Sequence, residues 1–66
     1  MYFDGTTLIT LLSDAENTAA IAPAIAADVR AQTSPFAVIE AAMELPDLGE
    51  DGVTAFLDEH GIGLRG

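Results

Sequence analysis

The chain has 66 residues, with eleven acidic residues against two arginines, no lysine and no cysteine, and a formal net charge of −9. This charge excludes nucleic acid and anionic membranes as direct partners, and the lack of cysteine excludes disulfides and thiolate metal sites. A chain this short forms one domain, residues 1–66, and its hydrophobic content of 50% predicts a folded protein rather than a disordered one.

The N-terminal segment, residues 1–16, has two interpretations. Asp4-Gly5 lies between apolar and β-branched residues, as in the two-residue turn of a β-hairpin. Alternatively, Asp4 caps a helix whose apolar face carries Leu8, Leu11, Leu12 and Ala15. Because a two-stranded ribbon is marginal by itself, we favour a helix over residues 5–15.

The middle of the chain predicts a connection over residues 16–22, followed by a helix that begins at Pro23. Proline suits the first position of a helix because its missing N–H would be unpaired there. In the segment PAIAADVRAQ, an apolar face is formed by Ile25, Ala26 and Val29.

The C-terminal half predicts two more helices. Ser34-Pro35 has the pattern of an N-cap followed by proline at the first helical position, and Pro46 stops that helix after about Leu45. Asp51 then caps a helix over residues 52–60, which ends at Gly61 as a left-handed C-cap.

The expected fold is therefore mainly α, a compact single domain of about four short helices without an internal repeat. The alternative is an α+β fold with an N-terminal hairpin around Asp4-Gly5. Leu48 and Ile62 are expected to fill the loops. Apolar periodicity predicts a core of Phe36, Ile39, Met43, Val53, Phe56 and Leu57, with Leu8, Leu11 or Leu12, and Val29 packed against it.

Two short motifs do not survive inspection. GIGLRG matches a dinucleotide-binding fingerprint, but no helix follows it to hold a pyrophosphate. The segment Asp47–Asp58 resembles a calcium loop, yet its third position is Gly49 and its twelfth is not glutamate. A loop between helices explains the second segment better.

Catalytic chemistry has little basis in this sequence. His60 is the single histidine, and it is expected in the last turn of a helix, where a positive charge suits the dipole. No serine lies in a nucleophile motif. The sequence therefore predicts a protein that is not an enzyme and has no cofactor and no metal site.

Acidic residues are concentrated in the stretch from Ser34 to His60, which contains no lysine or arginine. Its seven carboxylates are the candidate partner-binding residues: Glu40, Glu44, Asp47, Glu50, Asp51, Asp58 and Glu59. Glu40 and Glu44 lie one helical turn apart, about 6 Å along the axis. This spacing is comparable to that of phosphates along a DNA strand, roughly 6–7 Å.

Small size, the absence of lysine and the acidic run EAAMELPDLGEDG resemble the small phage-encoded inhibitors that mimic DNA, including many anti-CRISPR proteins. The resemblance is one of composition over the whole chain. It implies a non-enzymatic inhibitor, in the cytoplasm of a bacterial host cell, that blocks a basic nucleic-acid-binding protein or a CRISPR effector complex. We expect no direct contact with nucleic acid or membrane, and a monomer or a small homodimer.

The alternative function is a small assembly or docking module. Alanines at positions 19, 22 and 26 surround Ile21 and Ile25, and small residues on a helix allow close approach of a second helix. Such a module would bind through an apolar face rather than through its charges.

Overall fold

The computed structural model describes residues 1–65. Over this range the chain forms four helices and three two-residue strands, which confirms the mainly α fold. In chain order the elements are β1 (Tyr2–Phe3), α1 (Gly5–Ser13), α2 (Ala15–Ala27), β2 (Gln32–Thr33), α3 (Pro35–Glu44), α4 (Gly49–His60) and β3 (Gly63–Leu64). None of the helices in residues 1–65 has the length and apolar character needed to cross a membrane.

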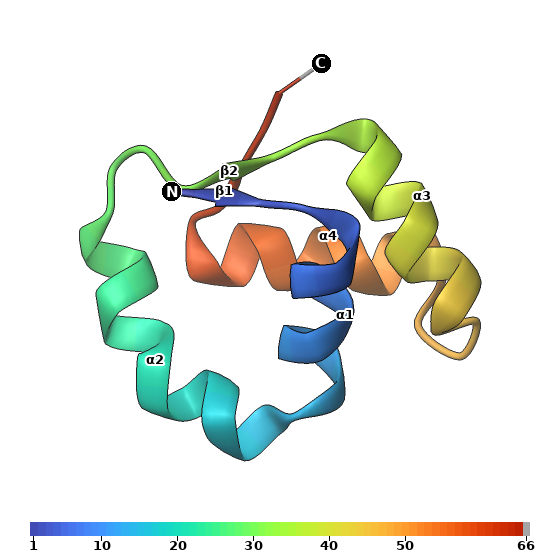
Figure 1. The fold of residues 1–66 in the computed structure, drawn as a ribbon, viewed down its shortest axis with the longest axis horizontal. Coiled ribbons are helices and arrows are strands. Elements are labelled where there is room, and N and C mark those ends of the chain that lie inside the picture. Colours follow the sequence, from blue (N-terminus) through green and yellow to red (C-terminus); the bar gives the residue numbers. More distant parts are fainter. Residues whose placement is uncertain (66) are drawn as a thin grey trace.

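The three strands form one parallel sheet in the order β1-β2-β3. In Figure 1 the strands lie above α1 and α4, with α2 and α3 on opposite sides of α1 and with α4 running behind α1. Each helix pair connects one strand to its neighbour. The unit strand–helix–helix therefore occurs twice, and a third strand follows.

The helical interpretation of the N-terminal segment is confirmed, and the hairpin is wrong. The Asp4 carboxylate accepts a hydrogen bond from the Thr7 N–H at 2.8 Å, which caps α1. Residues 2–3 do form a strand, but its partner is β2 in parallel orientation. Hence Asp4-Gly5 is a junction between a strand and a helix rather than a hairpin turn.

Helix α2 corrects the predicted connection at residues 16–22 and the predicted start at Pro23. Asp14 caps it by accepting from the Asn17 N–H at 3.1 Å, and the helix continues through Pro23 to Ala27. Seven alanines lie in this helix, four before the proline and three after it, and alanine has the highest helix propensity. This propensity sustains the helix despite one missing backbone donor.

The chain leaves α2 earlier than the sequence predicted. Residues 28–31 turn, and Gln32–Thr33 become a strand instead of the end of a helix. Asp28 organises the turn, because its carboxylate accepts from the Arg30 N–H at 2.9 Å and lies 3.0 Å from the Met1 amino group. Val29, expected in the core, is 96% exposed at the turn.

The last two helices follow the prediction with one correction. The Ser34 hydroxyl accepts from the Ala37 N–H at 3.2 Å, and α3 ends before Leu45-Pro46 as expected. Helix α4 begins at Gly49 without a side-chain cap, so Asp51 lies inside its first turn and is not the cap. Gly61 ends α4 with a φ of 69°, as predicted.

The core contains other residues than expected and lies on a different face of α3. Val53, Leu57, Leu8 and Leu11 are buried as predicted, and Phe56 is half-buried. Phe36, Ile39 and Met43 are instead exposed, and Leu48 does not fill its loop. The other buried apolar residues are Phe3, Ile25, Ala31, Ala37, Val38, Ala41 and Ile62.

Small side chains explain which face of α3 turns inward. Ala37 and Ala41 are fully buried, which lets α3 approach α1 closely. At the closest point a Cβ on Gly5 would lie 2.5 Å from a carboxylate oxygen of Glu40. Because almost every residue of α3 is apolar, periodicity could not choose between this face and the bulkier one.

Candidate functional site

The seven candidate carboxylates are all exposed on α3, on α4 and on the loop between them. Glu40 and Glu44 lie on the flank of α3 that faces α1, where they border a shallow hollow with Thr6, Ile9 and Met43. Glu40 reaches across to Gly5, so this flank is in contact with α1.

Helix α4 carries four of the seven acids in two groups. Glu50 and Asp51 lie in the first turn, where the positive end of the helix dipole favours a carboxylate. Asp58 and Glu59 lie in the last turn, where the dipole disfavours one. Seven residues separate Asp51 from Asp58, so they share a helix face about 10 Å apart along the axis.

The seven carboxylates have no partners of their own within residues 1–65: none accepts a hydrogen bond or forms a salt bridge there. The acids of the N-terminal half behave differently. Asp4 and Asp14 cap helices, and Asp28 holds both a turn and the Met1 amino group. We call the seven carboxylates of α3, α4 and their loop the acidic cluster. The fold therefore uses three acids outside the acidic cluster, whereas the cluster itself has no hydrogen-bond or salt-bridge partner within residues 1–65.

The internally used acids show the expected electrostatic signature. The backbone hydrogen bond from Thr7 lowers the pKa of the Asp4 carboxyl below its ordinary value. The pKa of Asp28 is lowered by the backbone hydrogen bond from Arg30 and, to a smaller extent, by the Met1 amino group. Both effects stabilise the ionised carboxylate in the folded protein.

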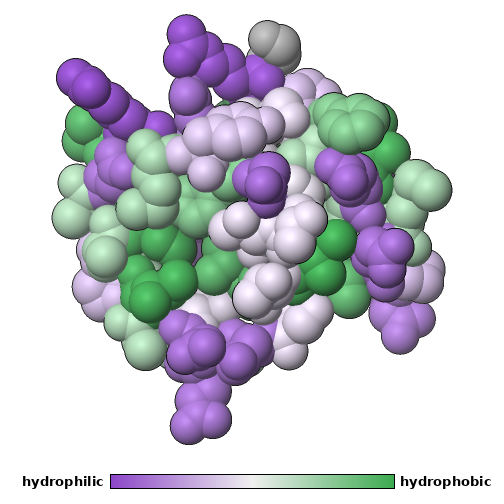
Figure 2. Space-filling view, in the orientation of Figure 1, coloured by the Kyte–Doolittle hydropathy of each residue, from purple (hydrophilic) through white to green (hydrophobic). Residues whose placement is uncertain are grey.

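Hydrophilic side chains do not cover one continuous surface on the face seen in Figure 2. Figure 2 shows hydrophilic side chains in separate groups around the rim, with hydrophobic side chains between them. Among residues 1–65, no three histidine or acidic side chains converge on a point that could hold a metal ion.

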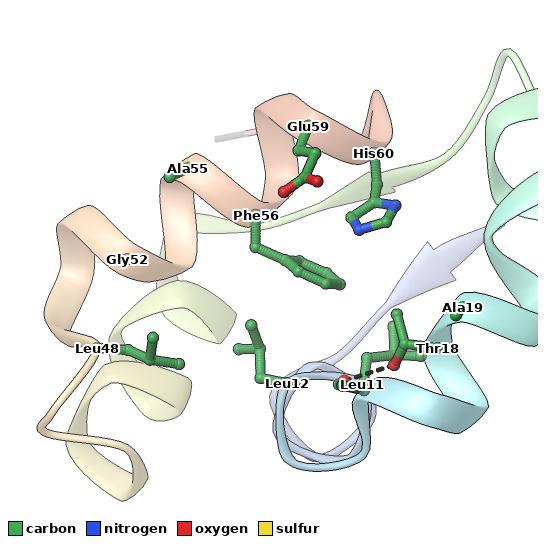
Figure 3. Close-up of a pocket in the computed structure, with 11 residues that line it drawn as sticks. Leu11, Leu12, Thr18, Ala19, Leu48, Gly52, Ala55, Phe56, Glu59 and His60 are labelled. Atoms are coloured by element: carbon green, nitrogen blue, oxygen red, sulfur yellow. Dashed lines mark hydrogen bonds between the residues drawn. The ribbon is translucent and has the colours of Figure 1, made fainter.

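An apolar pocket, which sequence reasoning missed, lies between α4 and the corner formed by α1 and α2. It encloses about 390 Å³, and Figure 3 shows Leu12, Leu48 and Phe56 projecting toward its interior. Ala15 and Ala19 line the α2 side, one turn apart. The signal for the pocket in the sequence was this pair of small residues, because alanine side chains leave space beside α2.

The polar groups of this pocket come from the end of α4. Glu59 and His60 both line it, and the His60 ring lies against Phe56 with 4.4 Å between ring centroids. The Thr18 hydroxyl is already used, since it donates to the Leu11 carbonyl, as Figure 3 shows. His60 occupies the last turn of a helix, as the sequence predicted.

The pocket residues do not form a nucleophile and base. Of the two serines, Ser13 ends α1 and does not line the pocket, while Ser34 caps α3 and accepts a hydrogen bond from the Tyr2 hydroxyl at 3.1 Å.

No protein-family model, curated protein or solved structure matches this chain.

Proposed function

We propose that this protein is a non-enzymatic inhibitor that presents carboxylates in place of DNA phosphates to a basic nucleic-acid-binding protein, such as a CRISPR effector complex. The observation that supports the proposal is that the acids fall into two groups, those that bind within the fold and those that do not. The seven carboxylates of α3, α4 and their loop are exposed and have no partners within residues 1–65, whereas Asp4, Asp14 and Asp28 are used by the fold.

Free carboxylates suit this role for an energetic reason. A carboxylate already paired inside its own protein would have to break that pair before it could meet a lysine or arginine of the partner. An unpaired carboxylate loses only its hydration, and the net charge of −9 adds long-range attraction toward a basic groove. Added salt should weaken this attraction, as it weakens DNA binding.

Single charge reversals test the proposal. Glu44→Lys and Asp51→Lys change two positions of the acidic cluster, and Glu16→Lys is the matched control. Glu16 is exposed on α2, accepts no hydrogen bond within residues 1–65, and its reversal changes the net charge equally. Asp4 and Asp14 are unsuitable controls, because their reversal would remove helix caps.

The readout is cleavage of target DNA by purified CRISPR effector complexes, with and without the protein. Inhibition by the wild-type protein should fall at least tenfold in the two cluster variants and by much less in Glu16→Lys. Equal losses in all three variants would mean that only bulk charge matters. Binding to none of the complexes, or to no other DNA-binding protein tested by competition with duplex DNA, would refute the mimic.

A docking or assembly module is the second candidate function, and the exposed apolar side chains of α2 favour it. Only Thr18 and Ile25 are buried along this helix, while Ala19, Ala26 and Ile21 are exposed. A partner of such a face would bind through apolar contacts, so its affinity should tolerate salt. Measuring affinity against salt concentration separates the two functions.

A further inference from the structure

The parallel sheet arranges the repeating units in a stack, with β1 at one edge and β3 at the other. Paired positions of β1 and β2 are 30 residues apart, and those of β2 and β3 are 31 apart. The caps follow the same spacing, because Asp4 and Ser34 each precede a helix directly after a strand. Strand β3 therefore occupies the position where a third unit would begin.

One ladder position shows that the stack is open at β3. Phe3, Thr33 and Leu64 are aligned across the three strands. Phe3 is 3% exposed and Thr33 is not exposed at all, whereas Leu64 is 55% exposed. The same position is thus a core position in the two complete units and an uncovered apolar one in the third.

Helix α3 carries an uncovered apolar surface that corresponds to a covered one on α1. Thirty residues separate Ile9 from Ile39. Ile9 is half-buried and lies opposite Glu40 and Met43 of the next unit, whereas Ile39 is 46% exposed. With Phe36, which is 69% exposed, it forms an exposed apolar stripe on α3. We call this stripe, together with Leu64, the open end.

At the opposite end of the stack, the exposed surface of α1 carries small, uncharged side chains. Thr7 is the counterpart of Ala37, which is buried where α3 meets α1, and both Thr7 and Thr10 are exposed on α1. In Figure 2 the middle of the viewed face, over α1, is correspondingly pale. We call this surface of α1 the threonine end.

The strand edges at the two ends are complementary. Gln32 N–H donates to the Met1 carbonyl, and Arg65 N–H donates to the Thr33 carbonyl. Because backbone groups in a strand alternate between its two sides, those of Tyr2 and Leu64 point toward the free edges of β1 and β3. A parallel strand beside β3 could continue the ladder without rearrangement.

We infer that a second copy of this chain stacks head to tail, with its threonine end on the open end of the first and its β1 beside β3. In the register of the existing ladder, Arg65 of one copy lies beside Asp4 of the next, so a positive charge comes near the carboxylate that caps α1. Small threonines can approach Ile39 as Ala37 approaches α1. Because the two surfaces differ, each added copy leaves one free end of each kind, so the association extends beyond the dimer.

This association opposes the net charge of −9 per copy, so it should strengthen as salt screens the repulsion. It is independent of the proposed inhibitor function, whose binding weakens with salt. Opposite salt dependence allows one proposal to fail while the other stands.

Two charge-matched variants test the inference by complementation. Ile39→Glu blocks the open end and Thr7→Glu blocks the threonine end, and both residues are exposed, so the fold should persist. Ala20→Glu adds the same charge at an exposed position of α2 outside both ends. Circular dichroism and thermal unfolding confirm that each variant is folded.

Sedimentation velocity at increasing concentration and salt gives the readout. We expect wild type and Ala20→Glu to exceed the monomer mass of 6.8 kDa and to grow beyond the dimer. Each blocking variant alone should stay monomeric, and their equimolar mixture should stop at a dimer. A wild type that stays monomeric throughout, or a Thr7→Glu variant that dimerises alone through α3, would overturn the inference.

Discussion

At the scale of single residues, the acids of this chain divide by what their carboxylates do. Asp4 and Asp14 satisfy backbone donors at the starts of α1 and α2, and Asp28 does so in the turn before β2. Helix starts need such acceptors because their first N–H groups have no partner within the helix. An acid that caps a helix is therefore not available to a partner protein.

Replacing Asp4 with asparagine should reveal its titration. The pKa of Asp4 is lowered in the folded protein. The ionised carboxylate therefore contributes fully to the free energy of unfolding above the ordinary pKa of 3.8, and this contribution is lost as the pH falls through the lower folded pKa. Asparagine caps about as well but does not titrate. Thermal unfolding of both proteins across pH should show a constant difference above about pH 5 and a decline for wild type below pH 4. A difference that changes between pH 7 and pH 5 would contradict the role given to Asp4.

At the scale of elements, helix α3 shows how packing can override an apolar pattern. Its inward face is built from small residues, Ala37 and Ala41, and its bulkiest residue, Phe36, is 69% exposed. Close contact between α1 and α3 needs small side chains at the crossing, and Gly5 provides the matching space on α1. The bulky apolar residues are consequently left on the outside.

Two alanine substitutions test this assignment of the core. Leu8 is fully buried, so Leu8→Ala should lower the free energy of unfolding by about 2–5 kcal/mol, enough to unfold much of so small a domain. Phe36→Ala should change it by less than about 0.5 kcal/mol, as surface substitutions do. Urea unfolding followed by circular dichroism measures both. Comparable losses at the two positions would show that Phe36 belongs to the core.

At the scale of the whole molecule, unbalanced charge opposes the compact fold. Within residues 1–65, the one salt bridge joins Asp28 to the Met1 amino group, and the seven carboxylates of α3, α4 and their loop have no such partner. Like charges held close together in a small domain raise its free energy relative to the extended chain. The chain tolerates this cost although few residues form its core.

Salt should therefore stabilise the isolated protein. Raising the ionic strength to about 1 M shortens the screening length to about 3 Å, which removes most repulsion between surface carboxylates. We expect the midpoint of thermal unfolding to rise with sodium chloride, measured at low protein concentration so that self-association does not contribute. A fall in the midpoint would indicate attractive pairs among the surface charges.

The sequence by itself determined the helices that begin at clear caps. Asp4 and Ser34 were recognisable as helix starts and Gly61 as a helix end, because capping depends on residues a few positions apart. The acidic stretch was equally visible, since charge is a property of composition. Whether Pro23 began a helix or lay inside one was not visible, because alanine-rich segments on both sides satisfy either reading.

Only the tertiary structure decided the sheet, the core face of α3 and the open end of the stack. Two-residue strands are too short to show a periodic pattern. β1 and β2 pair at positions that are 30 residues apart, and no local sequence pattern predicts that pairing. On α3 both faces are apolar, so the choice fell to the shape of the neighbour, where Gly5 admits Glu40 and the alanines admit α1. Contacts between segments far apart in the chain depend on complementary shapes, and no local pattern encodes the shape of a distant partner.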